Sequence, residues 1–402
     1  MPIGATIHSL LQEAEMPHLE AALGALEVYE LDAAYRSGRP SLLALLKAQG
    51  LSLPESQKFA NAFGKATRAA EADEPAPRRA SVTTRLYAVS DLHWDHPENR
   101  AWLEKLQPLA HADDAIILAG DISHRPSVIE ECLRGFKARF AHVFFCPGNH
   151  ELWVKRDDAH VAAAGRFETS LDKLRWLLDL CASLGVHTQP LKLAGGVWVV
   201  PLLSWYQSNL DGLATAQSLK HAEEVVSDAH LCAWPLGCSS DSIADELAQR
   251  NQKALARAYD GPVVSFSHFL PRADLMPPRQ NMGARGFLLD VSGCRSLETQ
   301  LRQLGSRLHV FGHTHINWDA HIDGTHYIQN AVRYPRDRTE WASSVDKVLS
   351  GDISRLQIWS SDLPDTFCPL PERCNCAVGL SHRSGAIAAR TPLFPNWAPE
   401  AS

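Results

Sequence analysis

The sequence predicts a layered α/β domain that follows a small all-helical domain. From residue 84 onward, short apolar runs alternate with stretches of helical pattern, and nearly continuous apolar strands are typical of a sheet covered on both faces. The first 70 residues differ, because their leucines recur at helical spacing instead. The predicted strands are residues 86–89, 115–118, 143–145, 197–200, 263–266 and 308–311.

The helical domain is expected to span residues 1–70. Leu19, Leu23 and Leu26 stand three or four residues apart, as the buried face of a helix requires. The leucines between residues 42 and 46 predict a further helix, and a bundle of short helices fits the whole segment.

The remaining boundaries follow from composition. Residues 71–83 are charged and rich in Pro and Ala, which predicts a linker. The α/β domain then covers residues 84–360, and residues 207–260 are expected to form helices and loops outside its sheet. Residues 361–402 are rich in Pro, Cys and Ser without periodicity, so we expect a poorly ordered tail.

The overall composition narrows the class of protein. The 402 residues are 45% hydrophobic, enough for a large core, and the net charge of −7 argues against a broad nucleic-acid-binding face. No apolar run is long enough to span a membrane, and the N-terminus lacks the pattern of a signal peptide. Cys132, Cys146 and Cys181 lie in apolar surroundings, which predicts buried thiols and a cytoplasmic protein.

Five of the six predicted strands end at a residue that can bind a metal ion. In α/β sheets, ligands gather just beyond the carboxyl ends of the strands, so we expect these residues to meet in one crevice. Gly120, Gly148 and Gly312 allow the tight turns and close backbone approach that such a crevice needs. The strand ends carry Asp91 and His93, Asp121, Asn149 and His150, His268, and His313 and His315.

The chemistry of these side chains favours a pair of transition metal ions. With His150 set aside, three of the remaining seven offer oxygen, four offer imidazole nitrogen, and none is a cysteine, a mixture that suits Mn, Fe, Zn or Co. Seven ligands exceed what one ion uses, whereas two ions that share one aspartate use them comfortably. The predicted ligands are Asp91, His93, Asp121, Asn149, His268, His313 and His315.

Taken together, the strand-end motifs resemble those of the calcineurin-like metallophosphoesterase superfamily over roughly residues 85–335. The resemblance implies a four-layered α/β/β/α sandwich and two metal ions that share Asp121. It also implies that His150 protonates the leaving oxygen or stabilises the transition state. One ion would be held by Asp91, His93, Asp121 and His315. The other would be held by Asp121, Asn149, His268 and His313.

The expected reaction is hydrolysis of a small phosphomonoester or phosphodiester. Two metal ions lower the pKa of a water molecule between them, so that hydroxide can attack phosphorus in line. Arg125, and Arg272 close to His268, are candidates to bind the phosphate oxygens. A protein serine/threonine phosphatase is an alternative, although His124 stands where those enzymes have an aspartate.

A second alternative is a catalytically weak metal-binding scaffold that acts through its helical domain. Residues 18–69 resemble a sterile-alpha-motif (SAM-like) domain through their leucines alone, and such a domain would recruit a protein partner. A helical extension packed on the main domain explains the same pattern.

Overall fold

The chain divides into two units, Met1–Val82 and Thr83–Ser402, which are described separately. The computed structural model describes residues 11–12, 16–23, 26, 31, 34–35, 37–73, 83–106, 111–154, 167–338, 353–365 and 367. The predicted tail beyond residue 367 and most of the predicted linker lie outside these residues.

Helices form the described part of the first unit, as the leucine spacing predicts, although the last of them has 21 residues and is longer than the short helices expected. Their apolar faces meet in one core that buries Leu23, Leu46 and Phe59. The last helix continues to Asp73, so the first residues of the predicted linker belong to it. The SAM-like resemblance stays a prediction. The elements are η1 Pro17–Leu19, α2 Glu20–Leu23, α4 Arg39–Ala48 and α5 Leu53–Asp73.

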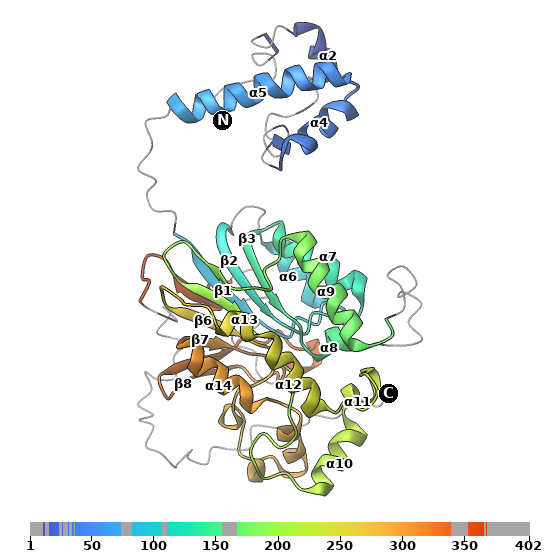
Figure 1. The fold of residues 1–402 in the computed structure, drawn as a ribbon, viewed down its shortest axis with the longest axis vertical. Helices are drawn as coiled ribbons and strands as arrows, with labels where there is room; N and C mark the ends of the chain where they lie inside the picture. The colour runs from blue at the N-terminus through green and yellow to red at the C-terminus, as the bar shows by residue number, and fades with distance from the viewer. Residues whose placement is uncertain are drawn as a thin grey trace. The chain divides into compact units, whose positions relative to one another are not determined.

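Two sheets form the centre of the second unit (Figure 1). The first has the order β10-β1-β2-β3 and is parallel except for β10, and the second has the order β4-β5-β6-β7-β9-β8 with β5, β6, β7 and β9 parallel. The strands of the first sheet are β1 Arg85–Val89, β2 His111–Ala119, β3 Phe140–Cys146 and β10 Gln357–Ser360. Those of the second are β4 Leu191–Lys192, β5 Trp198–Pro201, β6 Val263–Phe266, β7 Ser306–Val310, β8 Trp318–Ile322 and β9 Thr325–Gln329.

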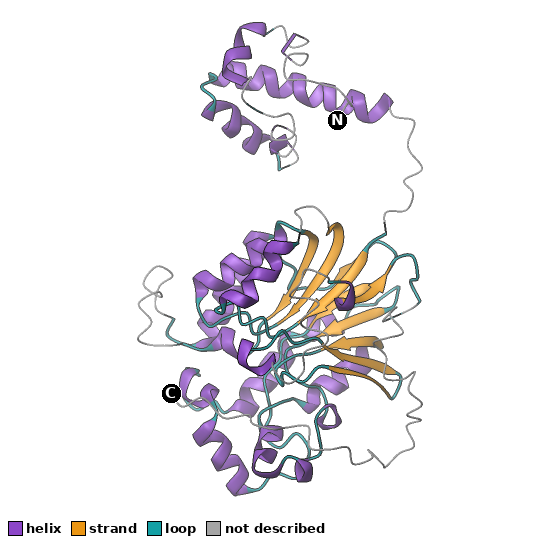
Figure 2. Ribbon diagram, turned by 180° about the vertical axis from the view of Figure 1, so that it is seen from behind, coloured by secondary structure: helices purple, strands orange, loops and turns teal. Residues whose placement is uncertain are grey.

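Alternation of side chains along the strands separates the core into three layers. Ala88 and Ile117 of the first sheet join Phe266 of the second in the cluster between the sheets. Their neighbours Tyr87 and Ile116 face the opposite way. Because both faces of each sheet are buried, helices must cover the outside, and the four-layered α/β/β/α prediction is confirmed (Figure 2).

Among the described residues, three helices cover the first sheet and three cover the second. The apolar side of α7 buries Ile129, Leu133 and Phe136 against the first sheet, which its helical spacing allows. The covering helices are α6 Pro97–Lys105, α7 Pro126–Lys137 and α9 Ser170–Leu184 on one side, and α12 Ser240–Arg250, α13 Gln252–Leu255 and α14 Arg295–Leu304 on the other.

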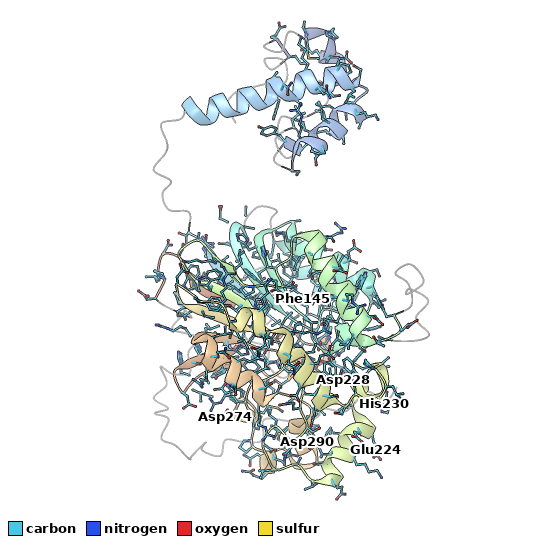
Figure 3. The ribbon with its side chains drawn as sticks, viewed as in Figure 1. Phe145, Glu224, Asp228, His230, Asp274 and Asp290 are labelled. Carbon is cyan, nitrogen blue, oxygen red and sulfur yellow. The ribbon has the colours of Figure 1, made fainter. Side chains whose placement is uncertain are left out.

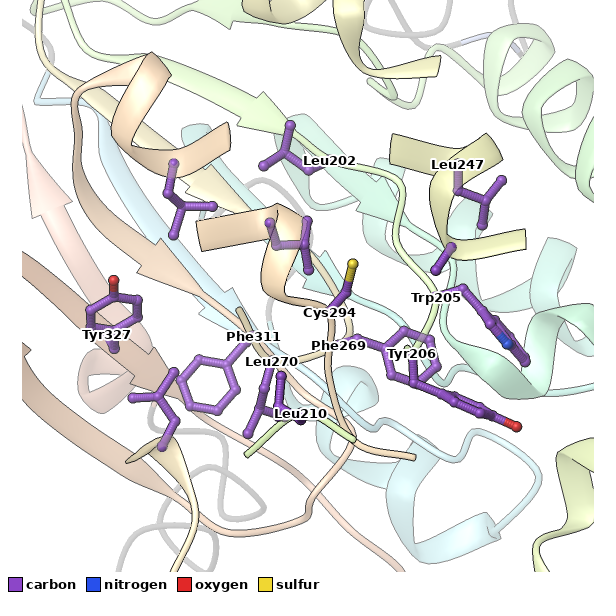
Figure 4. Close-up of a cluster of buried hydrophobic side chains, with 14 of the residues drawn as sticks. Leu202, Trp205, Tyr206, Leu210, Leu247, Phe269, Leu270, Cys294, Phe311 and Tyr327 are labelled. Carbon is purple, nitrogen blue, oxygen red and sulfur yellow. The ribbon is translucent and has the colours of Figure 1, made fainter. Parts of the chain in front are cut away.

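Helices and loops between β5 and β6, and after β6, extend the outer layer of the second sheet. Their core contains Trp205, Tyr206 and Phe269 and is shown in Figure 4. Residues 207–260 therefore form helices outside the sheet, as their composition predicts. The additional elements are α10 Ala216–Val225, α11 Ser227–Leu231, η3 Ala273–Leu275, η4 Arg279–Asn281 and η5 Gly283–Asp290.

The structure also bears on the cysteine side chains and on membrane-spanning helices. Cys132, Cys146 and Cys181 are free and buried, as predicted. Among the residues that the structure describes, no helix combines the length and the apolar composition that crossing a membrane requires.

Candidate metal centre

The loops after β1, β2, β3, β6 and β7 meet where the carboxyl ends of the two sheets come together. Backbone hydrogen bonds tie these loops to one another. The amide of Asp91 donates to the carbonyl of Gly120 at 3.0 Å, and the amide of Gly312 donates to the carbonyl of His268 at 2.9 Å. The predicted ligands are thereby brought to one place from five strands.

Two glycines make this close approach possible. A Cβ atom on Gly148 would lie 2.2 Å from Oδ1 of Asp121, and one on Gly120 would lie 2.5 Å from Nδ1 of His268. Gly120 also has a φ of +80°, in the left-handed region that favours glycine. The Gly-Asp and Gly-Asn pairs of the motifs therefore have a steric cause.

The first group of candidate ligands surrounds Asp91. One ligand atom from each member lies within 4.8 Å of the others, and the members are Asp91, His93, Asp121 and His315. Nε2 of His93 lies 2.9 Å from Nε2 of His315. Because Nδ1 of His315 lies 3.4 Å from a carboxylate oxygen of Asp337, its hydrogen belongs there and Nε2 presents a lone pair to the group.

The second group contains Asp121, His268 and His313, so Asp121 belongs to both. The amide oxygen of Asn149 lies 3.1 Å from Nε2 of His268 and 3.1 Å from Nδ1 of His313. The opposite nitrogen of each ring faces a backbone carbonyl: that of Ala119 at 2.9 Å for His268, and that of Val291 at 3.1 Å for His313.

These contacts fix the hydrogens of both rings. A carbonyl can only accept, so Nδ1 of His268 and Nε2 of His313 carry the hydrogens, and the nitrogens that face Asn149 are lone pairs. Lone pairs that converge on an amide oxygen and a carboxylate repel one another unless a cation stands between them. The donor set of the second group therefore fits a metal ion.

Burial has opposite effects on the acids and bases of the centre. It lowers the pKa of His93, His268 and His313, which favours the neutral imidazole that binds metals. Burial, with the nearby carboxylates of Glu151 and Asp91, raises the pKa of Asp121 well above its usual range. A cation at the shared carboxylate would supply the missing positive charge.

Backbone strain is concentrated in the same residues. Five of the seven predicted ligands have a positive φ, although none is a glycine. Such conformations cost about 1–3 kcal/mol each and persist where function requires them. The φ angles are 52° for Asp91, 41° for His93, 55° for Asp121, 74° for His313 and 56° for His315.

His150 lies beside the shared aspartate. Its Nε2 is 3.8 Å from Oδ2 of Asp121, and its ring packs on the indole of Trp153 with centroids 3.8 Å apart. The hydroxyl of Tyr334 lies 3.4 Å from the same Nε2, and the ring of Tyr334 stacks on His93 at 4.0 Å. His150 is thus held between two aromatic rings at the edge of the centre.

Glu151 binds the two central loops together, a role the sequence does not reveal although the residue stands in a motif. Its Oε2 accepts hydrogen bonds from the amides of Asp121 (2.9 Å) and Gly148 (2.6 Å). Its Oε1 accepts from those of Ile122 (2.6 Å) and Ser123 (3.1 Å). The side chain is fully buried.

Asp228 on α11 also contacts the centre, and no motif pointed to it. Its Oδ1 accepts hydrogen bonds from the amide nitrogen of Asn149 at 2.9 Å and from the indole nitrogen of Trp153 at 2.6 Å. Burial raises the pKa of Asp228 to about 6. No signal near residue 228 in the sequence could have connected it with residues about 75 positions earlier.

The two arginines proposed to bind phosphate are engaged with carboxylates. Nε of Arg125 lies 2.7 Å from Oδ1 of Asp95. Arg272 pairs with Asp274, Glu298 and Asp323 at 2.6 to 3.3 Å. Both guanidinium groups are thus engaged by carboxylates of the protein itself, and the predicted substrate-binding role of Arg125 and Arg272 stays a prediction.

Comparison with known proteins adds independent information. Residues 84–317 match the sequence profile described as calcineurin-like phosphoesterase. The acyl-carrier-protein phosphodiesterase PptH of Mycobacterium tuberculosis is 28% identical over 269 residues, which are 63% of this chain and 78% of that protein. The crystal structure of the phosphopantetheinyl hydrolase PptH from Mycobacterium tuberculosis matches with a TM-score of 0.55 and 26% identity, covering 66% of this chain and 95% of that one.

Proposed function

Because the chain belongs to the calcineurin-like phosphoesterase family and is a metal-dependent hydrolase of phosphate esters, we propose that its centre holds two divalent ions that share Asp121. The observation that carries this proposal is the pair of imidazole lone pairs aimed at Asn149, each fixed by a carbonyl behind the ring. Mn, Fe or Zn suits this mixture of oxygen and nitrogen.

Each ion would be held by four side chains. Asp91, His93, Asp121 and His315 would hold the first, and Asp121, Asn149, His268 and His313 would hold the second. When bound, such ions would lower the pKa of a water molecule and neutralise charge on phosphate oxygens.

We assign proton donation to His150. Since its Nε2 lies 3.8 Å from Oδ2 of Asp121, a phosphate bound to ions that share this carboxylate would meet the imidazole ring. Burial lowers the pKa of His150, whereas the negative charge of a bound phosphate favours the protonated form. The protonated ring can then donate to the oxygen that leaves phosphorus, which stabilises the departing alkoxide.

We further propose that the substrate is a phosphodiester that links a phosphopantetheinyl group to an acyl carrier protein. The support is the similarity to PptH, which is named as an acyl-carrier-protein phosphodiesterase and as a phosphopantetheinyl hydrolase. The same centre would also accommodate a small phosphomonoester or another phosphodiester, because the metal ligands alone select no leaving group.

The role of the N-terminal unit and the cellular compartment are the subjects of two separate proposals. We keep residues 1–70 as a helical module that contacts a protein partner, and the cytoplasm as the compartment. Free, buried cysteines support a reducing compartment.

The test compares three substrates with Mn²⁺-loaded protein. These are phosphopantetheinylated acyl carrier protein, followed by mass spectrometry, bis(p-nitrophenyl) phosphate, and p-nitrophenyl phosphate. We expect both diesters to be cleaved, and Asp121→Asn to abolish the activity. The exposed Asp260 provides a matched control, since Asp260→Asn should keep it.

Three outcomes would contradict parts of the proposal. Cleavage of the monoester alone would refute the phosphodiesterase, and cleavage of the aryl diester alone would refute the carrier-protein substrate. No cleavage of any substrate by protein that binds Mn²⁺ would favour a binding scaffold.

A further inference from the structure

One buried carboxylate outside the predicted ligand set contacts both Asn149 and Trp153, the residue whose indole packs on His150. We propose that Asp228 is a positioning residue that fixes the amide of Asn149 and the indole behind His150 through a single oxygen atom. This inference rests on the proposed function, in which Asn149 is a metal ligand and His150 a proton donor.

The first contact selects the orientation of the Asn149 amide. An asparagine side chain can turn its oxygen or its nitrogen toward a metal ion with almost the same shape, and only the oxygen is a ligand. Asp228 accepts from Nδ2 at 2.9 Å, so that Oδ1 faces His268 and His313 at 3.1 Å each. Without this acceptor, nothing in these contacts would favour the binding orientation over the reverse.

The second contact orients the ring against which His150 packs. The indole nitrogen of Trp153 donates to Asp228 at 2.6 Å, and the indole lies 3.8 Å from the His150 ring at an interplanar angle of 31°. Among the residues described, Asp121 is the one carboxylate paired with the His150 ring, and it is a candidate metal ligand. His150 is therefore held by packing on an indole whose own position Asp228 sets.

The helix that carries Asp228 is itself anchored to this region. The amide of Val154 donates to the carbonyl of Leu231 at 2.7 Å, and the amide of Ser170 donates to that of Ala233 at 2.7 Å. Figure 3 labels Asp228 on α11, with His230 on the same short helix. The segment between β5 and β6 thus supplies a buried carboxylate to a centre whose ligands come from other loops.

Three variants separate the two contacts. Asp228→Ala removes both hydrogen bonds, whereas Asp228→Asn keeps a carbonyl oxygen with two lone pairs and can accept both. Trp153→Phe keeps an aromatic ring against His150 but removes the N–H. Metal affinity is measured by calorimetric titration of Mn²⁺ into metal-free protein, and folding by thermal unfolding in the metal-free state.

We expect Asp228→Ala to weaken Mn²⁺ binding about 10–100-fold, the usual effect of losing a partner of a metal ligand. Asp228→Asn should recover most of that affinity. Trp153→Phe should bind Mn²⁺ as the wild type does. Its kcat should fall more for methyl phenyl phosphate, which has a poor leaving group, than for methyl p-nitrophenyl phosphate, which has a good one. A misplaced proton donor matters most when the leaving group is poor.

Several results would overturn the inference. Wild-type affinity in Asp228→Ala would refute the contact with Asn149, and so would equal losses in Asp228→Ala and Asp228→Asn. Equal reductions of kcat for both esters in Trp153→Phe would refute the contact that acts on His150. If Asp228→Ala does not fold, Trp153→Phe still decides the contact that acts on His150, and a large loss of Mn²⁺ affinity in Asp228→Asn, which can still accept both hydrogen bonds, would refute the contact with Asn149. Failure of the wild type to bind Mn²⁺ would instead refute the proposed function.

Discussion

Replacing Glu151 by glutamine should destabilise the second unit more than its small change of structure suggests. The carboxylate is fully buried and accepts four backbone hydrogen bonds, two at each oxygen. Glutamine has nearly the same shape, but one of its two terminal groups is an NH₂ donor. Whichever way the amide turns, two backbone N–H groups lose their acceptor and face another donor.

The size of the effect follows from these bonds. A hydrogen bond to a charged group contributes about 1.5–3 kcal/mol net, so the loss of two gives about 3–6 kcal/mol. Full burial of the side chain means that water cannot replace the lost acceptor. Because the bonds join the loops of Asp121 and Gly148, the variant should also bind Mn²⁺ more weakly.

The assay is urea unfolding of the metal-free chain, followed by tryptophan fluorescence. Glu130→Gln is the matched control, since Glu130 is partly exposed and pairs with the exposed Arg134, where the same substitution should cost less than about 0.5 kcal/mol. If the free energy of unfolding of Glu151→Gln lay within about 1 kcal/mol of the wild-type value, the four backbone amides would not need the charged carboxylate as their acceptor.

Other predictions concern a glycine, a hydroxyl and a buried histidine. Gly148→Ala, whose Cβ would lie 2.2 Å from Asp121, should lower stability by about 1–3 kcal/mol and weaken Mn²⁺ binding in calorimetry; unchanged values would contradict the close approach. Tyr334→Phe, which removes a hydroxyl 3.4 Å from His150, should lower kcat about three- to tenfold without changing metal affinity, and an unaltered kcat would exclude a role for the hydroxyl. Burial lowers the pKa of His309 from 6.5 to about 3, so the unfolded chain takes up the proton first as pH falls, and stability is lost between these values. His309→Gln should flatten that part of the stability profile measured by urea unfolding, and parallel profiles would contradict the prediction.

The parts of the fold that local pattern determines could be predicted from the sequence. Each predicted strand overlaps an observed one, and the run at Val263–Phe266 matches its strand throughout. The strand ends carry the predicted ligands because parallel strands bring their carboxyl ends to one edge. The hairpin of β8 and β9 was missed although Asp323-Gly324, with φ of 49° and 83°, is a recognisable turn signal between alternating residues.

What depends on tertiary contact left no local signal. β10 pairs antiparallel with β1 across about 270 residues, so neither strand indicates the other. Asp228 reaches Asn149 from an irregular helical segment, and Tyr334 reaches His150 from a loop after β9. One of the three ion pairs of Arg272 likewise involves Asp323, a residue of the hairpin turn about 50 positions later.

The number and position of bound ions decide whether Asp121 is shared by two metals. Crystals grown with Mn²⁺ should give two peaks in an anomalous difference map, about 3.5–4 Å apart, on opposite sides of the Asp121 carboxylate. One should lie beside His93 and His315 and the other beside His268 and His313. A single peak, or two peaks away from Asp121, would contradict the two-metal centre.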